Sequence, residues 1–158
     1  MKSFTYYMPT RVICGRDCVL EQGELFRELG THAFIVTGKS SAKNNSLGDV
    51  LAALEKNGQT VTVFDRVTPN PTVACVREGI VLLMAAGADF IVAIGGGSPM
   101  DAAKAIATLA VQERTDEEIF AGGYEARALP MAHVPTTAGT GSEVTPYSIL
   151  TNDARQTK

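Results

Sequence analysis

Cysteine and histidine are scarce in this chain of 158 residues, which has three cysteines and two histidines. The cysteines, at positions 14, 18 and 75, are odd in number and lack the spacing of a zinc site, which argues against a zinc cluster. They fit a reducing compartment, so we expect a cytoplasmic protein. His32 and His133 have no second ligand at metal spacing, and we interpret both as structural residues.

An excess of one charge and long apolar runs are also lacking. The formal net charge is −3, which gives no electrostatic reason to expect a nucleic-acid partner. No apolar run approaches the roughly 18 residues of a membrane span, and residues 1–12 lack the apolar core of a signal peptide. The remaining balance, 45% hydrophobic and 20% charged residues, is typical of a soluble globular protein, and the length suits one domain over residues 1–158.

Strand and helix patterns alternate along the chain. Apolar runs predict strands at 4–7, 11–13, 33–37, 61–64, 90–94, 131–134 and near 147–150. Helical spacing predicts helices at 19–29, from a Ser46 cap to Gly58, from a Thr72 cap to Gly87, and from Ser98 onward. Residues 112–128 are polar and predict a loop with one helical turn. The alternation predicts an α/β fold, a Rossmann-like parallel sheet flanked by helices.

Residues 91–104, IVAIGGGSPMDAAK, join an apolar strand to a helix through three glycines. Ser98 is the predicted N-cap, Pro99 suits the first helical position, and Asp101 stands at capping-box spacing. Free N–H groups at such a helix N-terminus bind anions, so we expect a phosphate here; the alternative is a purely structural turn. The dinucleotide fingerprint is incomplete because Met100 occupies its third glycine, and no P-loop spacing is present.

Three loops follow predicted strands, at residues 38–41, 95–98 and 135–143. Ligands of parallel sheets collect at the carboxyl ends of the strands, so three such loops at one edge indicate a nucleotide cleft. The third loop, PTTAGTGSE, carries four hydroxyls, each both donor and acceptor, which can hold phosphate, ribose or carboxamide groups. The alternative for this loop is a solvated surface segment.

The segments GGGSPMDAAKAIA and PTTAGTGSEVT resemble the two N-terminal signatures of the iron-dependent (group III) alcohol dehydrogenase family. TGKSSAKNNS, TPNPT and MPTRVICG are also similar to that family in order and spacing, so the likeness covers essentially the whole chain. The resemblance implies an N-terminal α/β dinucleotide-binding domain and a C-terminal helical domain that supplies the metal. It also implies hydride transfer between NAD(P) and a small alcohol or its aldehyde or ketone.

The resemblance further implies which residues bind the cofactor, NADP or NAD. The residues expected at the pyrophosphate are Gly95, Gly96, Gly97 and Ser98, with Asp101 behind them. Those expected at the inner phosphate, ribose and nicotinamide are Thr136, Thr137, Thr140 and Ser142. Asn70 is expected beside the adenosine, and Tyr147 and Lys158 near ribose hydroxyls.

Position 38 is where this family can place an Asp that binds the adenosine 2′-hydroxyl. This chain has Gly38, followed by Lys39, Ser40 and Ser41, which removes a repulsive carboxylate and adds donors. We therefore expect NADP(H) to be accepted and preferred. The alternative is that Gly38 only makes the turn and Lys39 points into water, which leaves a weak preference.

In the family, one Asp and three His of the helical domain bind the divalent metal, and this sequence stops at Lys158 before them. We therefore expect no catalytic and no metal-binding residue here, Fe²⁺ or Zn²⁺ only in a full-length protein, and no turnover by this part alone. The alternative is a stand-alone nucleotide-binding or dimerising module; a polyol or sugar-phosphate dehydrogenase is disfavoured by the PTTAGTGSE loop. Pairing of residues 3–8 across a homodimer is expected from the resemblance.

Overall fold

The computed structural model describes residues 3, 5, 7–39 and 45–152. Ser40, Ser41 and Lys158, which the sequence places in the cofactor site, lie outside these residues, as does part of the strand predicted at 4–7.

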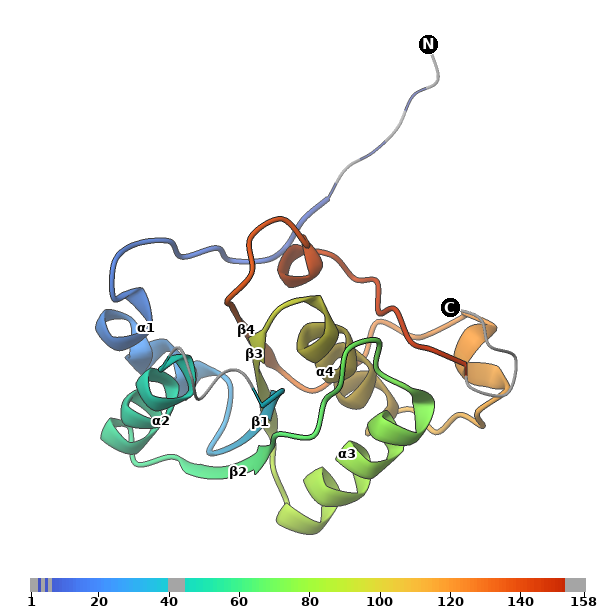
Figure 1. Cartoon of the computed structure of the whole chain (residues 1–158), viewed down its shortest axis with the longest axis horizontal. Helices are drawn as coiled ribbons and strands as arrows, with labels where there is room; N and C mark the ends of the chain where they lie inside the picture. The colour runs from blue at the N-terminus through green and yellow to red at the C-terminus, as the bar shows by residue number, and fades with distance from the viewer. Residues whose placement is uncertain (1–2, 4, 6, 40–44, 153–158) are drawn as a thin grey trace.

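Four strands form one parallel sheet in the described part of the chain (Figure 1). They are β1 (His32–Thr37), β2 (Thr60–Phe64), β3 (Phe90–Gly95) and β4 (Met131–Pro135), in the order β2-β1-β3-β4. All three pairs are parallel, with Ile35 opposite Val92 and Val92 opposite Ala132. The α/β prediction is confirmed, and the carboxyl ends of all four strands meet at one edge.

Helices cover both faces of the sheet (Figure 1). Alternate residues of β1 point to opposite faces, so Phe34 packs with α3 (Val73–Ala86) and α4 (Gly97–Leu109). Ile35 packs on the other face with α2 (Ser46–Lys56) and the 3₁₀ segment η1 (Gly23–Glu28). Because β1 and β3 are buried on both sides, they read as continuous apolar runs in the sequence.

The helix boundaries agree with the sequence in some places and differ in others. The Thr72 side chain accepts a hydrogen bond from the Cys75 amide at 3.2 Å, as predicted for the N-cap of α3, which ends at Gly87 with φ 66°. Asn45, not Ser46, is the N-cap of α2. The helix predicted at 19–29 is divided at Gln22 into α1 (Cys18–Glu21) and η1.

Two predicted strands are wrong, those at 11–13 and 147–150. Residues 11–13 form no strand, and Val12 is 61% exposed, because the described residues offer that segment no partner strand. Residues 147–150 are not assigned to a strand, and the bridge between Thr151 and Thr72 lies just after them. The polar segment 112–128 does contain one short helical turn, η2 (Glu118–Phe120).

Candidate nucleotide-binding site

The three loops named from the sequence follow β1, β3 and β4, which are neighbours in the sheet. From β1 the chain continues outward to β2, whereas from β3 it continues in the opposite direction to β4. The strand order therefore reverses between β1 and β3. In open α/β sheets, ligands bind at such a switch point, in the crevice between the loops at the carboxyl edge of the strands.

The glycine turn, residues 95–97, ends β3 and starts α4. Gly95 has φ 142°, and a Cβ there would lie 2.8 Å from Cγ of Pro99, so only glycine fits this position. Gly96 is the N-cap of α4, and the prediction that Ser98 is the cap is wrong. The amides of the first turn of this 13-residue helix have no acceptor within the helix, which leaves them available for an anion.

Ser98 and Asp101 make other contacts than the predicted capping box. The Ser98 hydroxyl accepts a hydrogen bond from the Asn70 amide at 3.3 Å, which brings Asn70 beside the glycine turn. The Asp101 carboxylate accepts a hydrogen bond from the Ser142 hydroxyl at 2.6 Å and pairs with Lys104 at 3.1 Å. Gly96 has the extended backbone of an N-cap residue, with φ −90° and ψ −158°. It has no side chain, so no side-chain acceptor binds the first amides of α4.

The hydroxyl loop, residues 136–142, lies against the glycine turn. The Thr136 amide donates to the Gly95 carbonyl at 2.8 Å. A Cβ on Gly96 would lie 3.1 Å from Oγ1 of Thr137, and one on Gly97 would lie 3.7 Å from Cβ of Thr140. Two loops separated by about forty residues of sequence are thus in contact.

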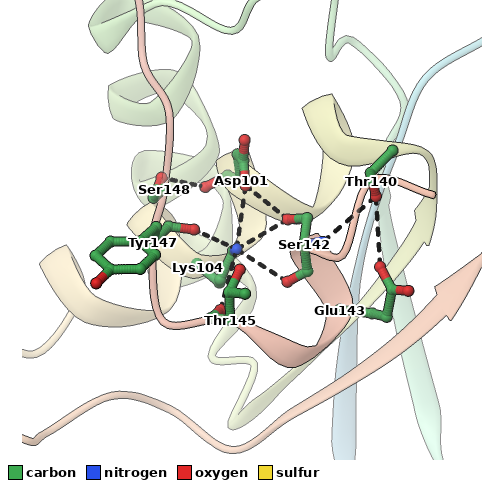
Figure 2. A network of polar contacts seen from close by, with 8 residues as sticks. All are labelled: Asp101, Lys104, Thr140, Ser142, Glu143, Thr145, Tyr147 and Ser148. Carbon is green, nitrogen blue, oxygen red and sulfur yellow. Dashed lines mark hydrogen bonds and ion pairs between the residues drawn. The ribbon is translucent and has the colours of Figure 1, made fainter. Parts of the chain in front are cut away.

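The other predicted residues are placed less uniformly. Gly38 directly follows β1, and a Cβ there would lie 3.0 Å from the carbonyl oxygen of Val67. Lys39 is exposed. Tyr147 is 73% exposed and its ring points away from the neighbouring polar groups, whereas its carbonyl accepts a hydrogen bond from Lys104 (Figure 2).

Lys104 is the residue of this region that the sequence reading missed. It is buried between α4 and the segment after the hydroxyl loop, and it contacts Asp101 and Ser142 (Figure 2). The available signal was a lysine among the alanines of residues 102–107, on a helix in which most side chains are buried.

Both histidines lie in the sheet. His32 Nε2 is 2.9 Å from the Thr62 hydroxyl. Nδ1 of His133 is buried and has no hydrogen-bond partner among the described residues. Burial, followed by the nearby Lys104 ammonium, lowers the pKa of His133 to about 4, so its ring is neutral near pH 7. No three His, Cys, Asp or Glu side chains within the described ranges are grouped to hold a metal ion.

A large groove of about 1420 Å³ lies elsewhere, along the edge of β4 that has no partner strand among the described residues. Residues 7 and 9–15, β4 and residues 143–148 line it, whereas the glycine turn and the hydroxyl loop do not. None of the helices in the described segments is both long and apolar enough to cross a membrane.

Comparison with known proteins identifies the family. A sequence model of the iron-containing alcohol dehydrogenase family matches residues 9–158. The chain is 39% identical over 154 residues to a protein of Bacillus subtilis named probable NADH-dependent butanol dehydrogenase 2, covering 96% of this chain and 40% of that protein. It is 34% identical to NADH-dependent butanol dehydrogenase B of Clostridium acetobutylicum, with the same coverage of both.

Solved structures agree with the sequence comparison. The crystal structure of an iron-containing alcohol dehydrogenase matches with a TM-score of 0.90 at 40% identity, over 97% of this chain and 43% of that one. A second such enzyme, from Thermotoga maritima, matches with a TM-score of 0.86 at 40% identity, over 96% of this chain and 43% of its own. The chain belongs to the iron-containing alcohol dehydrogenase family, and it spans about 40% of the length of these relatives.

Proposed function

We propose that this chain forms the dinucleotide-binding part of an NAD(P)-dependent alcohol dehydrogenase. The observation that carries the proposal is the contact between the glycine turn and the hydroxyl loop at the switch point of the sheet. The names of two relatives, which call them NADH-dependent, support it. A dinucleotide is the ligand whose length and charge suit a crevice with a helix N-terminus at one point and several hydroxyls beside it.

In this proposal the pyrophosphate binds at the N-terminus of α4, where the amides of Gly97 and Ser98 and the helix dipole favour negative charge. Pro99 has no N–H, so the anion contacts come from the residues before it. Thr137 and Thr140 bind the sugar and phosphate oxygens that lie over the turn. When bound, the nicotinamide supplies the hydride chemistry, and this part of the protein positions the ring.

We also propose that turnover of a small alcohol or aldehyde requires residues beyond those of this chain. The chain spans about 40% of its relatives, and the family is named for its iron, which a further part of the protein supplies; zinc is an alternative metal. The groove along β4 supports this proposal, because a further part of the protein could pack there. The groove combines a strand edge that is unpaired among the described residues with exposed apolar side chains such as Val12 and Ile13.

The substitution Gly96→Val tests the cofactor site. The valine Cβ would lie 3.1 Å from Thr137 Oγ1, and its two methyl groups extend into the space between the glycine turn and the hydroxyl loop. We expect isothermal titration calorimetry to show saturable binding of NADH or NADPH to the wild-type chain and none to the variant. The backbone at Gly96 is extended, so the far-UV circular dichroism should be unchanged.

Gly15→Val is the matched control. A Cβ at Gly15 would meet only Cβ of Cys18, at 3.9 Å, and the residue lies outside the crevice. This variant should bind the cofactor with the affinity of the wild type. If Gly96→Val also retains the wild-type affinity, the dinucleotide does not bind at the glycine turn and the assignment is wrong.

A further inference from the structure

Lys104 and Asp101 form a buried ion pair on the side of α4 that faces the segment after the hydroxyl loop. Lys104 is 7% exposed, and its Nζ lies 3.1 Å from Oδ1 of Asp101. Burying an ammonium group is unfavourable unless oxygen atoms replace its water shell. Here the oxygens come from Asp101, on the same helix, and from residues 142–147, so the ammonium keeps its full set of hydrogen bonds only while that segment lies on α4 (Figure 2).

The contacts concentrate on Ser142, where the hydroxyl loop ends. Its hydroxyl accepts from Lys104 at 2.8 Å and donates to Asp101 at 2.6 Å, while its carbonyl accepts from Lys104 at 3.0 Å. Lys104 also donates to the carbonyls of Thr145, at 3.3 Å, and Tyr147. Ser148 donates to the Asp101 carbonyl at 2.7 Å, so hydrogen bonds to α4 continue beyond the end of the loop (Figure 2).

The hydroxyl loop needs such an anchor at its second end. Its first end is fixed by β4 and by the bond from the Thr136 amide to Gly95. Between the ends lie Gly139 and Gly141, with φ 97° and 68°, which have many accessible conformations when unrestrained. The hydrogen bonds of Thr140 to its neighbours in the loop are long, at 3.4 Å.

We propose that Asp101 and Lys104 are a positioning pair: they hold the end of the hydroxyl loop on α4 and so keep Thr137 and Thr140 against the glycine turn. The inference rests on the proposed function, because its consequence is an effect on cofactor affinity. Asp101 and Lys104 follow Ser98 by one and two turns of α4, so the same helix that presents its N-terminus to the pyrophosphate also fixes the opposite wall of the crevice.

The test uses Lys104→Met, which keeps the length of the side chain and removes the ammonium group. We expect the dissociation constant for NADH, measured by fluorescence titration, to rise about tenfold, as when the loop occupies its binding position about one tenth of the time. Hydrogen exchange measured by mass spectrometry should become faster in residues 138–148 and remain slow in β1 and β3. Ser142→Ala, a smaller change, should shift both readouts in the same direction and decides the matter if Lys104→Met does not fold.

Leu83→Ala is the control for stability alone. Leu83 is buried in the core near the C-terminal end of α3, so this variant should melt at a lower temperature and bind NADH as the wild type does. A folded Lys104→Met or Ser142→Ala variant with wild-type affinity and wild-type exchange would overturn the proposal. If the wild type itself binds neither NADH nor NADPH, the proposed function fails, and the exchange of residues 138–148 still decides whether the pair holds the loop.

Discussion

Gly38 is the single residue whose replacement most directly addresses cofactor selectivity. A carboxylate at the end of β1 would repel the 2′-phosphate of NADP(H), and a glycine there has no charge that would do so. We therefore expect Gly38→Asp to weaken NADPH binding much more than NADH binding, as measured by calorimetric titration of both cofactors.

The structure supplies the control for that comparison. Because a Cβ at position 38 would lie 3.0 Å from the Val67 carbonyl, any side chain there causes some crowding. Gly38→Ala introduces the same crowding without the charge, and it should weaken the binding of NADPH and of NADH to the same extent. If Gly38→Asp and Gly38→Ala show the same ratio of NADPH affinity to NADH affinity, this loop does not distinguish the 2′-phosphate from the 2′-hydroxyl.

His133 introduces a pH dependence of stability. Its folded-state pKa of about 4, lowered first by burial and then by Lys104, lies below the value of about 6.5 expected for an unfolded chain. Between these values the unfolded chain binds a proton that the folded chain does not, so the free energy of unfolding falls as the pH decreases from about 6.5 to about 4. Above this window the contribution is constant.

His133→Gln removes that titration. In urea denaturation at a series of pH values, the stability of the variant relative to the wild type should rise as the pH decreases through the same window. Parallel pH profiles for the two proteins would show that the imidazole is not held neutral in the folded state.

At the scale of elements, α3 offers a clean test of local structure. The Thr72 hydroxyl accepts from the Cys75 amide and satisfies one of the unpaired donors of the first helical turn. Thr72→Ala should lower the free energy of unfolding by about 1 kcal/mol, as measured by urea denaturation. Thr72→Ser keeps the hydroxyl and should lose clearly less; an equal loss in both variants would contradict the capping role.

The central strands and the helices between them could be predicted from the sequence, because the signals are local. The continuous apolar runs of β1 and β3 reflect burial on both faces, and Thr72 and Gly87 are a cap and a stop for α3 within its own sequence. The strands at 11–13 and 147–150 could not be judged in the same way. Residue type favours an extended backbone there, but a ladder also requires a partner that the described residues do not supply.

The candidate site was only partly predictable for the same reason. The glycines at 95–97 and the hydroxyls at 136–142 were visible as motifs, and the sheet order brings them together. The spacing of Ser98 and Asp101 suggested a local capping box, but Asp101 binds Ser142, forty-one residues away, and the lysine of the same turn joins it. Contacts over that distance depend on the fold, and a single sequence does not encode them as a local pattern.

At the scale of the whole molecule, β4 is an edge strand of the sheet that the described residues form. The edge lies in a groove with apolar side chains, a surface that open sheets cover by pairing or by packing. We propose that the isolated chain self-associates, and we expect sedimentation velocity to show a dimer or larger species that increases with concentration. A monomer at all concentrations, with a high melting temperature, would contradict this.

The central claim, that the crevice between the glycine turn and the hydroxyl loop binds the dinucleotide, is tested most directly by amide chemical shifts. NADPH or NADH, added in separate titrations to the ¹⁵N-labelled chain, should shift the amides of Gly96, Gly97 and Ser98 most strongly, together with those of Thr137 and Thr140, because these groups lie at the N-terminus of α4 and along the loop that packs on it. Unchanged amides at these positions, or shifts gathered along the groove of β4, would contradict the account.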